Sequence, residues 1–350
     1  MSTQKAIVVN AVGERAVVAN KPIPQPGSKQ VQVRVTATAL NPHDQSVRDR
    51  GLFMDFIDPP VTLANDIAGI VTATAPDVTK LKVGDAIFWQ GSLLPGYIQQ
   101  GLQEYAIADE DFVSKIPEGF TINDVLTLPT NLIASVVGLF GTKTGLGIPA
   151  PWKEDGKSIN YSDVTVLIIG GGSNCGRFAV QLAGLAGFGK VVVVGGSEEQ
   201  LKPWGATHVI DRHGGHDVVL SRIREIVGDD LLYAYDAVNP DENQRLGINA
   251  LSSTKRGKFA RLVRRWERDD SILNPKQNGF ELINVFGSSH VVPDICAPLW
   301  AKIGEYLLEG KIVPLQYEVV EGLDVDKVNE VLDGYRDGKR VVQTHFRLSQ

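Results

Sequence analysis

The sequence has little cysteine, no long apolar run and no excess of basic charge. Only two of its 350 residues are cysteine, Cys175 and Cys296. They are too few for a disulfide framework or a four-cysteine zinc site. No apolar stretch approaches 18 residues, so we expect no membrane span. The N-terminus lacks the apolar region and cleavage site of a signal peptide, which predicts a soluble, cytoplasmic protein.

The composition also limits the possible partners. Lysine and arginine total 35 residues against 41 acidic ones, giving a net charge of −6. A mildly acidic chain is a poor general nucleic-acid binder, so no such partner is expected. Hydrophobic residues make up 43% of the chain, enough for sizeable cores. The length predicts about two domains.

The first third of the chain, to about residue 125, is typical of short antiparallel strands. Residues Val31–Ala37 alternate with period two, and Ala6–Val9, Ile67–Thr72 and Asp85–Trp89 are further candidate strands. Proline and glycine punctuate these segments. We therefore predict a barrel-like domain in this region.

Beyond residue 120 the pattern changes to that of alternating strands and helices. Thr121–Phe140 has apolar residues at helical spacing, interrupted by Pro129. Val164–Ile169 and Val191–Val194 are uninterrupted apolar runs, as in strands buried on both faces of a parallel sheet. The later candidate strands are 206–210, 233–237, 259–263, 281–286, 317–320 and 340–346, and the candidate helices are 177–187, 297–308 and 325–336. The pattern predicts an α/β, doubly wound parallel sheet.

A glycine turn follows the first buried run. Its spacing is Gly170-x-Gly172-x-x-x-Gly176, one residue longer than the usual dinucleotide fingerprint. A strand precedes it and a helix follows, so backbone N–H groups and the helix N-terminus can receive a pyrophosphate. An ordinary tight turn is the alternative. No Lys-Ser/Thr follows, which argues against a nucleoside-triphosphate loop.

The choice between NADPH and NADH depends on the end of the second strand. NAD sites place an acidic residue there to bind the ribose 2′-hydroxyl. This chain has Gly195-Gly196-Ser197 instead, and Arg212 follows the next strand. Glu198 and Glu199 come directly after Ser197 and weigh against a bound phosphate. We expect NADPH, with NADH as the alternative.

Several further segments occur in a specific order along nearly the whole chain. They are Ala39-Leu40-Asn41-Pro42-His43-Asp44, Asn65–Val71, Val78–Asp85, Lys115–Gly119, Leu128-Pro129, Trp204-Gly205-Ala206 and Tyr235–Val238. With the glycine turn, this set resembles the zinc-independent medium-chain dehydrogenase/reductases. More narrowly, it is similar to quinone oxidoreductases and to fungal trans-acting enoyl reductases, which share the proline-rich loop at 147–163.

The resemblance implies a nested arrangement of two domains. A GroES-like β-barrel catalytic domain would occupy residues 1–125, and a Rossmann NADP-binding domain residues 126–300. Residues 301–350 would return to the catalytic domain. The activity implied is hydride transfer from NADPH to an activated C=C bond, in fungal secondary metabolism.

No metal is expected. Zinc-dependent relatives carry a cysteine and a histidine where this chain has Asn41 and Asn65. The histidines 208, 213 and 216 form a cluster, for which a solvated loop is favoured over a metal site. Without a Lewis acid the substrate must carry its own activation, as an enone, an enoyl thioester or a quinone does.

The resemblance also implies site positions, although it assigns no catalytic residue. The cofactor-binding positions are His43, Asp44, Gln45, Ser46, Gly170, Gly172, Ser173, Asn174, Cys175, Gly176, Ser197, Glu198, Glu199, Gln200, Arg212, Leu262, Val263 and Gly338. The substrate positions are Ser135, Phe286, Gly287, Ser288 and Ser289. Fungal relatives commonly have lysine at the position of Ser46, so a lysine-dependent role is in doubt. Asn41-Pro42 could alternatively be a simple turn.

Three alternatives concern partners and activity. The basic stretch Lys255–Arg268 is either a solvated surface or a docking site for coenzyme A or an acyl-carrier domain. The chain could instead be a quinone oxidoreductase, or an idle NADPH-binding sensor or scaffold. A monomer and a homodimer are both compatible with the sequence.

Overall fold

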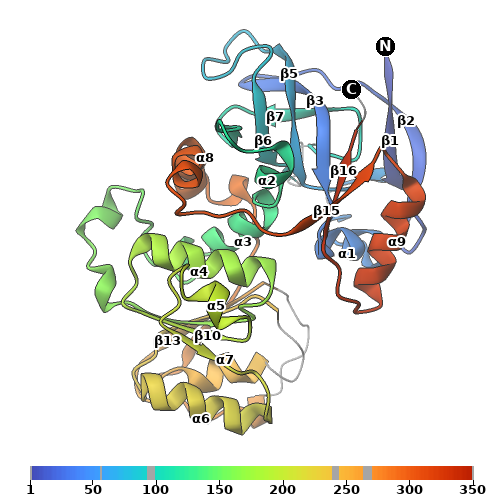
Figure 1. Ribbon diagram of the computed structural model, residues 1–350. Helices are drawn as coiled ribbons and strands as arrows, with labels where there is room; N and C mark the ends of the chain where they lie inside the picture. The colour runs from blue at the N-terminus through green and yellow to red at the C-terminus, as the bar shows by residue number, and fades with distance from the viewer. Residues whose placement is uncertain (1, 56, 93–98, 239–243, 263–269, 349–350) are drawn as a thin grey trace.

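The computed structural model describes residues 2–348 except 56, 93–98, 239–243 and 263–269. The chain forms two bodies, each built on a β-sheet (Figure 1). The N-terminal body carries both chain ends, and the second body contains the middle of the chain. The α/β fold class predicted from the sequence is confirmed.

The N-terminal body holds a seven-stranded and a three-stranded sheet. The larger has the order β15-β16-β3-β5-β6-β8, with β7 also on β3, and the smaller the order β2-β1-β4. The strands are β1 (Thr3–Val9), β2 (Val17–Pro22), β3 (Gln30–Ala39), β4 (Val61–Thr62), β5 (Asp66–Thr74), β6 (Ala86–Gln90), β7 (Tyr105–Asp109), β8 (Val113–Lys115), β15 (Tyr317–Glu321) and β16 (Gln343–Arg347).

The C-terminal residues return to the N-terminal sheet. Strand β16 pairs antiparallel with β3, placing His345 opposite Ala39, and β15 pairs parallel with β16. Helix α9 (Val325–Arg336) joins the two strands and packs against α1 (Pro42–Arg50). Residues more than 270 positions apart therefore build one sheet.

The second body is a six-stranded sheet in the order β11-β10-β9-β12-β13-β14. All of its neighbouring strands are parallel. The strands are β9 (Thr165–Ile169), β10 (Lys190–Val194), β11 (His208–Ile210), β12 (Tyr233–Asp236), β13 (Gly257–Arg261) and β14 (Phe280–Asn284). The order of pairing reverses between β9 and β12, where open α/β sheets bind ligands beyond their carboxyl ends.

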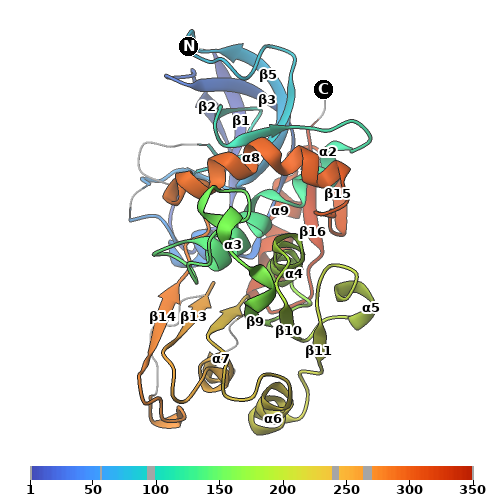
Figure 2. The same cartoon turned by 90° about the vertical axis from the view of Figure 1, so that its left-hand side faces the viewer.

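Helices cover both faces of this sheet. On the face toward the N-terminal body lie α3 (Pro129–Phe140) and α4 (Asn174–Ala186), and on the opposite face α6 (Gly215–Val227) and α7 (Gln244–Ala250) (Figure 2). The apolar residues of β9 and β10 are buried on both faces, as their uninterrupted runs predicted. The remaining helices are α2 (Ile122–Leu126), α5 (Glu198–Leu201) and α8 (Pro293–Leu308), with short 3₁₀ turns at Asp155–Ser158, Tyr161–Asp163, Asp270–Ile272 and Ser289–Val291.

Two local features follow from the position of a proline. Asn41-Pro42 is not a simple turn, because Asn41 caps α1 and Pro42 is its first residue. The apolar run 121–140 divides into α2 and α3, since Pro129 cannot continue a helix from the preceding turn.

Domain boundaries at 125 and 300 stay predictions. Helix α3 contacts β5 and β6 of the first body and β13 of the second. One hydrophobic cluster runs through both bodies, from Ala37 and Phe88 to Val166 and Trp300. No helix in the described part of the chain is long and apolar enough to cross a membrane.

Candidate active site

The glycine turn between β9 and α4 has the shape that a pyrophosphate requires. Gly170 has a φ of 90°, which favours glycine, and Ser173 caps α4 by accepting a 3.0 Å hydrogen bond from the N–H of Gly176. A Cβ on Gly176 would lie 2.1 Å from the Gly170 carbonyl oxygen, so only glycine fits. Gly172 is exposed, and a Cβ there would have no atom closer than 3.5 Å. These residues fit a dinucleotide.

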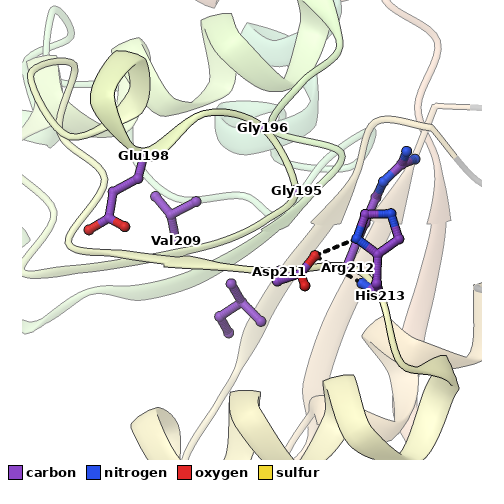
Figure 3. A pocket seen from close by; sticks show the side chains of 8 residues that line it. Gly195, Gly196, Glu198, Val209, Asp211, Arg212 and His213 are labelled. Atoms are coloured by element: carbon purple, nitrogen blue, oxygen red, sulfur yellow. Dashed lines mark hydrogen bonds and ion pairs between the residues drawn. The ribbon is translucent and has the colours of Figure 1, made fainter.

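A pocket of about 310 Å³ lies beyond the end of the second strand, β10 (Figure 3). Gly195 and Gly196 form its floor with φ values of 79° and 92°. The Arg212 side chain packs over Gly195, with its Cδ 3.6 Å from where a Cβ would be. Ser197 is exposed at the start of α5. A hydroxyl and a guanidinium thus lie near this strand end.

The two glutamates after Ser197 do not contact Arg212. Glu198 lies on the other side of the pocket in Figure 3 and forms a 2.5 Å ion pair with Lys202. Glu199 is exposed, and Gln200 is partly buried. The expected repulsion between these carboxylates and a bound phosphate is therefore reduced, because Glu198, although it lines the pocket, is paired with a lysine.

Helix α1 is held in place by Asp44. Its carboxylate accepts hydrogen bonds from the N–H groups of Asn41 and Ala64, both at 2.8 Å. The next residue, Gln45, donates to Asp49 at 2.8 Å along the helix. Asp44 and Gln45 are both buried. Two of the four α1 residues expected at the cofactor thus have structural partners.

His43 on α1 is bonded on one side and open on the other. Its Nε2 lies 2.9 Å from Oδ1 of Asn65, whose Nδ2 donates to the Gly91 carbonyl at 2.6 Å. The imidazole packs edge-on against Phe53, and Phe53 against Phe286, with centroid distances of 6.4 and 5.4 Å. Phe286 follows β14, so this contact series joins the N-terminal body to the carboxyl edge of the second sheet.

A buried polar network lies behind α1. Asp66 is fully buried and accepts from Asn41 Nδ2 at 2.7 Å, Gln343 Nε2 at 2.9 Å and the Thr130 N–H at 2.6 Å. Burial raises the pKa of Asp66 to about 6, although Thr130, Asn41 and His43 oppose the rise. A single carboxylate therefore connects β5, α1, α3 and β16.

The network continues to the glycine turn. Asn131 donates from Nδ2 to Asn41 at 3.1 Å and lies 3.5 Å from the Cys175 sulfur, which donates to its Oδ1. Burial, and then the Asp66 charge, raise the pKa of Cys175 to about 12, so its thiol stays protonated and unreactive. Ser135 donates to the Cys175 carbonyl at 2.7 Å and lies 3.3 Å from the Tyr235 hydroxyl.

Two serines expected at the substrate have internal partners instead. Ser135 is fully buried. Ser289 is also buried, donates to Gln90 at 3.1 Å and accepts from Trp300 Nε1 at 2.9 Å. Gln90 also donates to the Gly287 carbonyl at 2.7 Å. Both hydroxyls therefore have hydrogen-bond partners inside the protein, and a role at the substrate stays a prediction for both.

The C-terminal segment approaches the same helix end. Burial, and then the nearby positive charge of Arg340, lower the pKa of Arg177 in the first turn of α4. Gly338 lies just before Arg340 with a φ of 67°. Ser46 and Leu262 are partly exposed. Two positively charged side chains, Arg177 and Arg340, thus lie near the start of α4, which follows the glycine turn.

The basic stretch gives no continuous cationic face in its described part. Lys255 pairs with Asp230 at 2.7 Å, and Lys258 donates to the Leu146 carbonyl at 3.1 Å. Arg261 is buried and bonded to Asn284. Val263, Arg264, Arg265 and Arg268 lie outside the described residues.

The positions of the expected zinc ligands hold amides with other partners. Asn41 and Asn65 are both buried and hydrogen-bonded as described above. The cluster of histidines does not converge: His208 bonds to Thr207, His213 to Asp211, and His216 to Asp217. In the described ranges, no group of three or more His, Cys, Asp or Glu side chains could hold a metal.

Comparison with known proteins agrees with this geometry. Residues 27–118 match the alcohol dehydrogenase GroES-like domain. A trans-enoyl reductase of Fusarium mangiferae is 27% identical, with 97% of this chain and 99% of the relative aligned. The enoyl reductase component of the lovastatin nonaketide synthase of Aspergillus terreus is 26% identical over 96% of this chain and 93% of that one. The chain is thus similar to fungal trans-enoyl reductases over nearly its whole length.

Solved structures share the fold of this chain. The CurK enoyl reductase superposes with a TM-score of 0.75 at 17% identity, covering 99% of this chain and all of that one. A quinone oxidoreductase of Pseudomonas syringae superposes with a TM-score of 0.74 at 18% identity, covering 98% and 99%. The chain thus shares its fold with an enoyl reductase and a quinone oxidoreductase over nearly its whole length.

The sequence reasoning missed the residues that join the parts of the site. Asp66, Gln90, Asn131, Tyr235 and Gln343 were not selected as site residues. Asn131 and Ser135 are four residues apart in a helical pattern, a spacing that places them on one face. That spacing could have indicated that Asn131 and Ser135 lie together, whereas no pattern in the sequence indicates that Gln343 pairs with Asp66.

Proposed function

We propose that this reductase uses NADPH, without zinc, to reduce the C=C bond of an α,β-unsaturated carbonyl compound in fungal secondary metabolism. The observation that carries the proposal is the pair of amides, Asn41 and Asn65, at the expected zinc-ligand positions. Neutral amides are poor zinc ligands compared with thiolate and imidazole, and both are engaged in buried hydrogen bonds.

The cofactor preference rests on the pocket beyond β10. The 2′-phosphate of NADPH would lie near Ser197 and Arg212, and Gly172 and Ser173 would receive the pyrophosphate. Reduced nicotinamide supplies a hydride when bound. A guanidinium can bind a phosphate through two N–H groups, whereas a ribose hydroxyl gains little from it.

The reaction class follows from the two amides, Asn41 and Asn65, at the expected zinc-ligand positions. An isolated alcohol or aldehyde needs a metal or strong donor to polarise its oxygen. A conjugated carbonyl accepts a hydride at its β-carbon, because the charge moves to the carbonyl oxygen. The protein then has to orient the substrate and donate hydrogen bonds to that oxygen.

Replacing Arg212 tests the cofactor preference. The Arg212→Ala variant should weaken NADPH binding by about tenfold or more, the worth of a charge-assisted hydrogen bond of about 1.5–3 kcal/mol. NADH is the matched control, since it lacks only the 2′-phosphate, and Arg212→Lys should retain part of the affinity. Fluorescence titration of the reduced cofactor measures both. Equal losses for NADPH and NADH would contradict a phosphate contact.

A substrate panel tests the reaction. NADPH oxidation is followed with enones, enoyl thioesters of coenzyme A, quinones and simple aldehydes, with and without a chelator. We expect turnover of the conjugated carbonyl compounds and no effect of the chelator. Turnover of quinones alone would support a quinone oxidoreductase, and cofactor binding without any turnover would support a sensor or scaffold.

A further inference from the structure

The hydrogen-bond partners of His43 fix which ring nitrogen carries a proton. Asn65 presents its oxygen to Nε2, because its NH₂ group donates to the Gly91 carbonyl. The Asp44 carboxylate, a second acceptor, lies 3.7 Å from the same nitrogen. Nε2 is therefore an N–H donor, and Nδ1 is the nitrogen that can gain or lose a proton.

The Nδ1 side of the ring is free to meet a ligand. Within the described ranges, Nδ1 has no hydrogen-bond partner, and 21% of the His43 side-chain surface is exposed to solvent. The ring edge packs on Phe53, which holds an unusual φ of 71°, and Phe53 packs on Phe286. Strained backbone of this kind clusters at functional sites. An imidazole with one free nitrogen thus lies beside an aromatic lining that spans both bodies.

Other proton-bearing side chains nearby are unsuitable. The Cys175 thiol and the Tyr235 hydroxyl are buried against α3, and burial raises the pKa of each above its ordinary value. Ser135 is fully buried and donates to a backbone carbonyl. Asp44 and Asp66 are enclosed by donors. The His43 side chain, by contrast, is partly exposed.

We propose that His43 is the proton donor of the reduction, acting from Nδ1 on the carbonyl oxygen of an α,β-unsaturated substrate. This inference rests on the proposed function. Hydride from the reduced nicotinamide forms the new C–H bond at the β-carbon, and the C=C electron pair moves toward the carbonyl. The Nδ1–H bond breaks as its proton bonds to the oxygen, giving an enol that rearranges to the saturated carbonyl. Solvent then returns a proton to Nδ1.

Asn65 is a positioning residue in this arrangement. Its amide is itself fixed by Gly91, so it holds the ring through Nε2 and directs Nδ1 outward. The same position that suits a zinc ligand in metal-dependent relatives thus serves to orient an imidazole. A proton donor would replace the electrostatic role of the metal at the carbonyl oxygen.

The first experiment measures binding and needs no turnover. 4-Nitrophenol mimics an enolate, and its absorbance shows whether it binds as the phenol or the phenolate. We expect the wild-type protein with NADP⁺ to bind the phenolate about tenfold more tightly than His43→Gln, the worth of one charge-assisted hydrogen bond. His208→Gln is the control, since His208 is an exposed imidazole on β11.

The second experiment measures the reaction with an enone that the wild type reduces. His43→Gln should lower kcat about 100-fold, as for loss of a general acid, and His208→Gln should keep the wild-type kcat. Imidazole added to His43→Ala should restore part of the rate, which no structural defect would allow. Wild-type kcat and unchanged nitrophenol binding in His43→Gln would overturn the inference. A wild type that reduces no conjugated carbonyl would overturn the proposed function, while nitrophenol binding still tests His43.

Discussion

At the scale of single residues, Asp66 is the most constrained group in the site. It is fully buried, yet it organises Asn41, Gln343 and the start of α3 through three hydrogen bonds. A buried carboxylate is costly unless its charge is well solvated by donors. Here the effect of burial is larger than that of the hydrogen-bond donors, so the pKa of Asp66 rises to about 6.

The raised pKa of Asp66 predicts a pH-dependent stability. The folded protein binds this proton more tightly than the unfolded chain, so ionisation between the ordinary value of 3.8 and about 6 destabilises the fold. The melting temperature of the wild type, relative to Asp66→Asn, should therefore fall by a few degrees as pH rises through this window. Thermal melts of both proteins from pH 4 to 7 measure it.

The Asp66→Asn variant should fold, because the Gln343 Oε1 is buried with no hydrogen-bond partner among the residues that the structure describes, and it can accept from the new amide. Asp326→Asn, at an exposed position of α9, is the control and should track the wild type. A constant difference between the wild type and Asp66→Asn across this pH range would contradict the predicted shift.

At the scale of elements, the turn between β9 and α4 contains two glycines with different roles, one required by packing and one available for binding a ligand. Gly176 is required by the fold, since a Cβ would overlap the Gly170 carbonyl at 2.1 Å. Gly172 is not, since a Cβ there would contact only Gly196, at 3.5 Å. One short motif thus contains a glycine needed by the protein and another available to the ligand.

Two alanine variants test this separation. Gly176→Ala should destabilise the protein by about 1–3 kcal/mol or more through overpacking. Gly172→Ala should leave stability within about 0.5 kcal/mol but weaken NADPH binding, because its Cβ occupies the approach of the pyrophosphate. Thermal melts and cofactor titration measure the two effects. If Gly172→Ala bound NADPH normally, the phosphates would lie elsewhere.

At the scale of the whole molecule, the two bodies share a core and a set of polar bridges. Gln90 on β6 holds the loop after β14 through Gly287 and Ser289, and Ser289 in turn holds Trp300 on α8. These bonds are buried, so each lost partner would leave a donor or acceptor unsatisfied. The bridges fix the loop that carries Phe286 against the N-terminal body.

A pair of serine variants tests whether this bridge is structural. Ser289→Ala should lower stability by about 1–3 kcal/mol, because the Trp300 N–H loses its acceptor inside the protein. Ser288→Ala, one residue away, should change stability by less than about 0.5 kcal/mol. Chemical denaturation compares them. An unchanged stability in Ser289→Ala with an altered KM would instead place this hydroxyl at the substrate.

The sequence was sufficient for much of the fold. Uninterrupted apolar runs predicted β9 and β10 because a parallel strand is buried on both faces. Period-two alternation predicted β3, and helical spacing predicted α9 at the residues where the structure has it. Helix α1 was missed because its residues are mostly polar, and such a segment gives no apolar periodicity.

The local chain by itself determined the parallel sheet, the glycine turn and the absence of thiolates at the zinc-ligand positions, since each depends on neighbouring residues. Only the tertiary structure decided which polar groups meet. The bonds of Asp66 with Gln343, Asn65 with His43, and Gln90 with Ser289 join residues 277, 22 and 199 positions apart. No periodicity encodes such pairs, because they arise when two sheets close around a shared core.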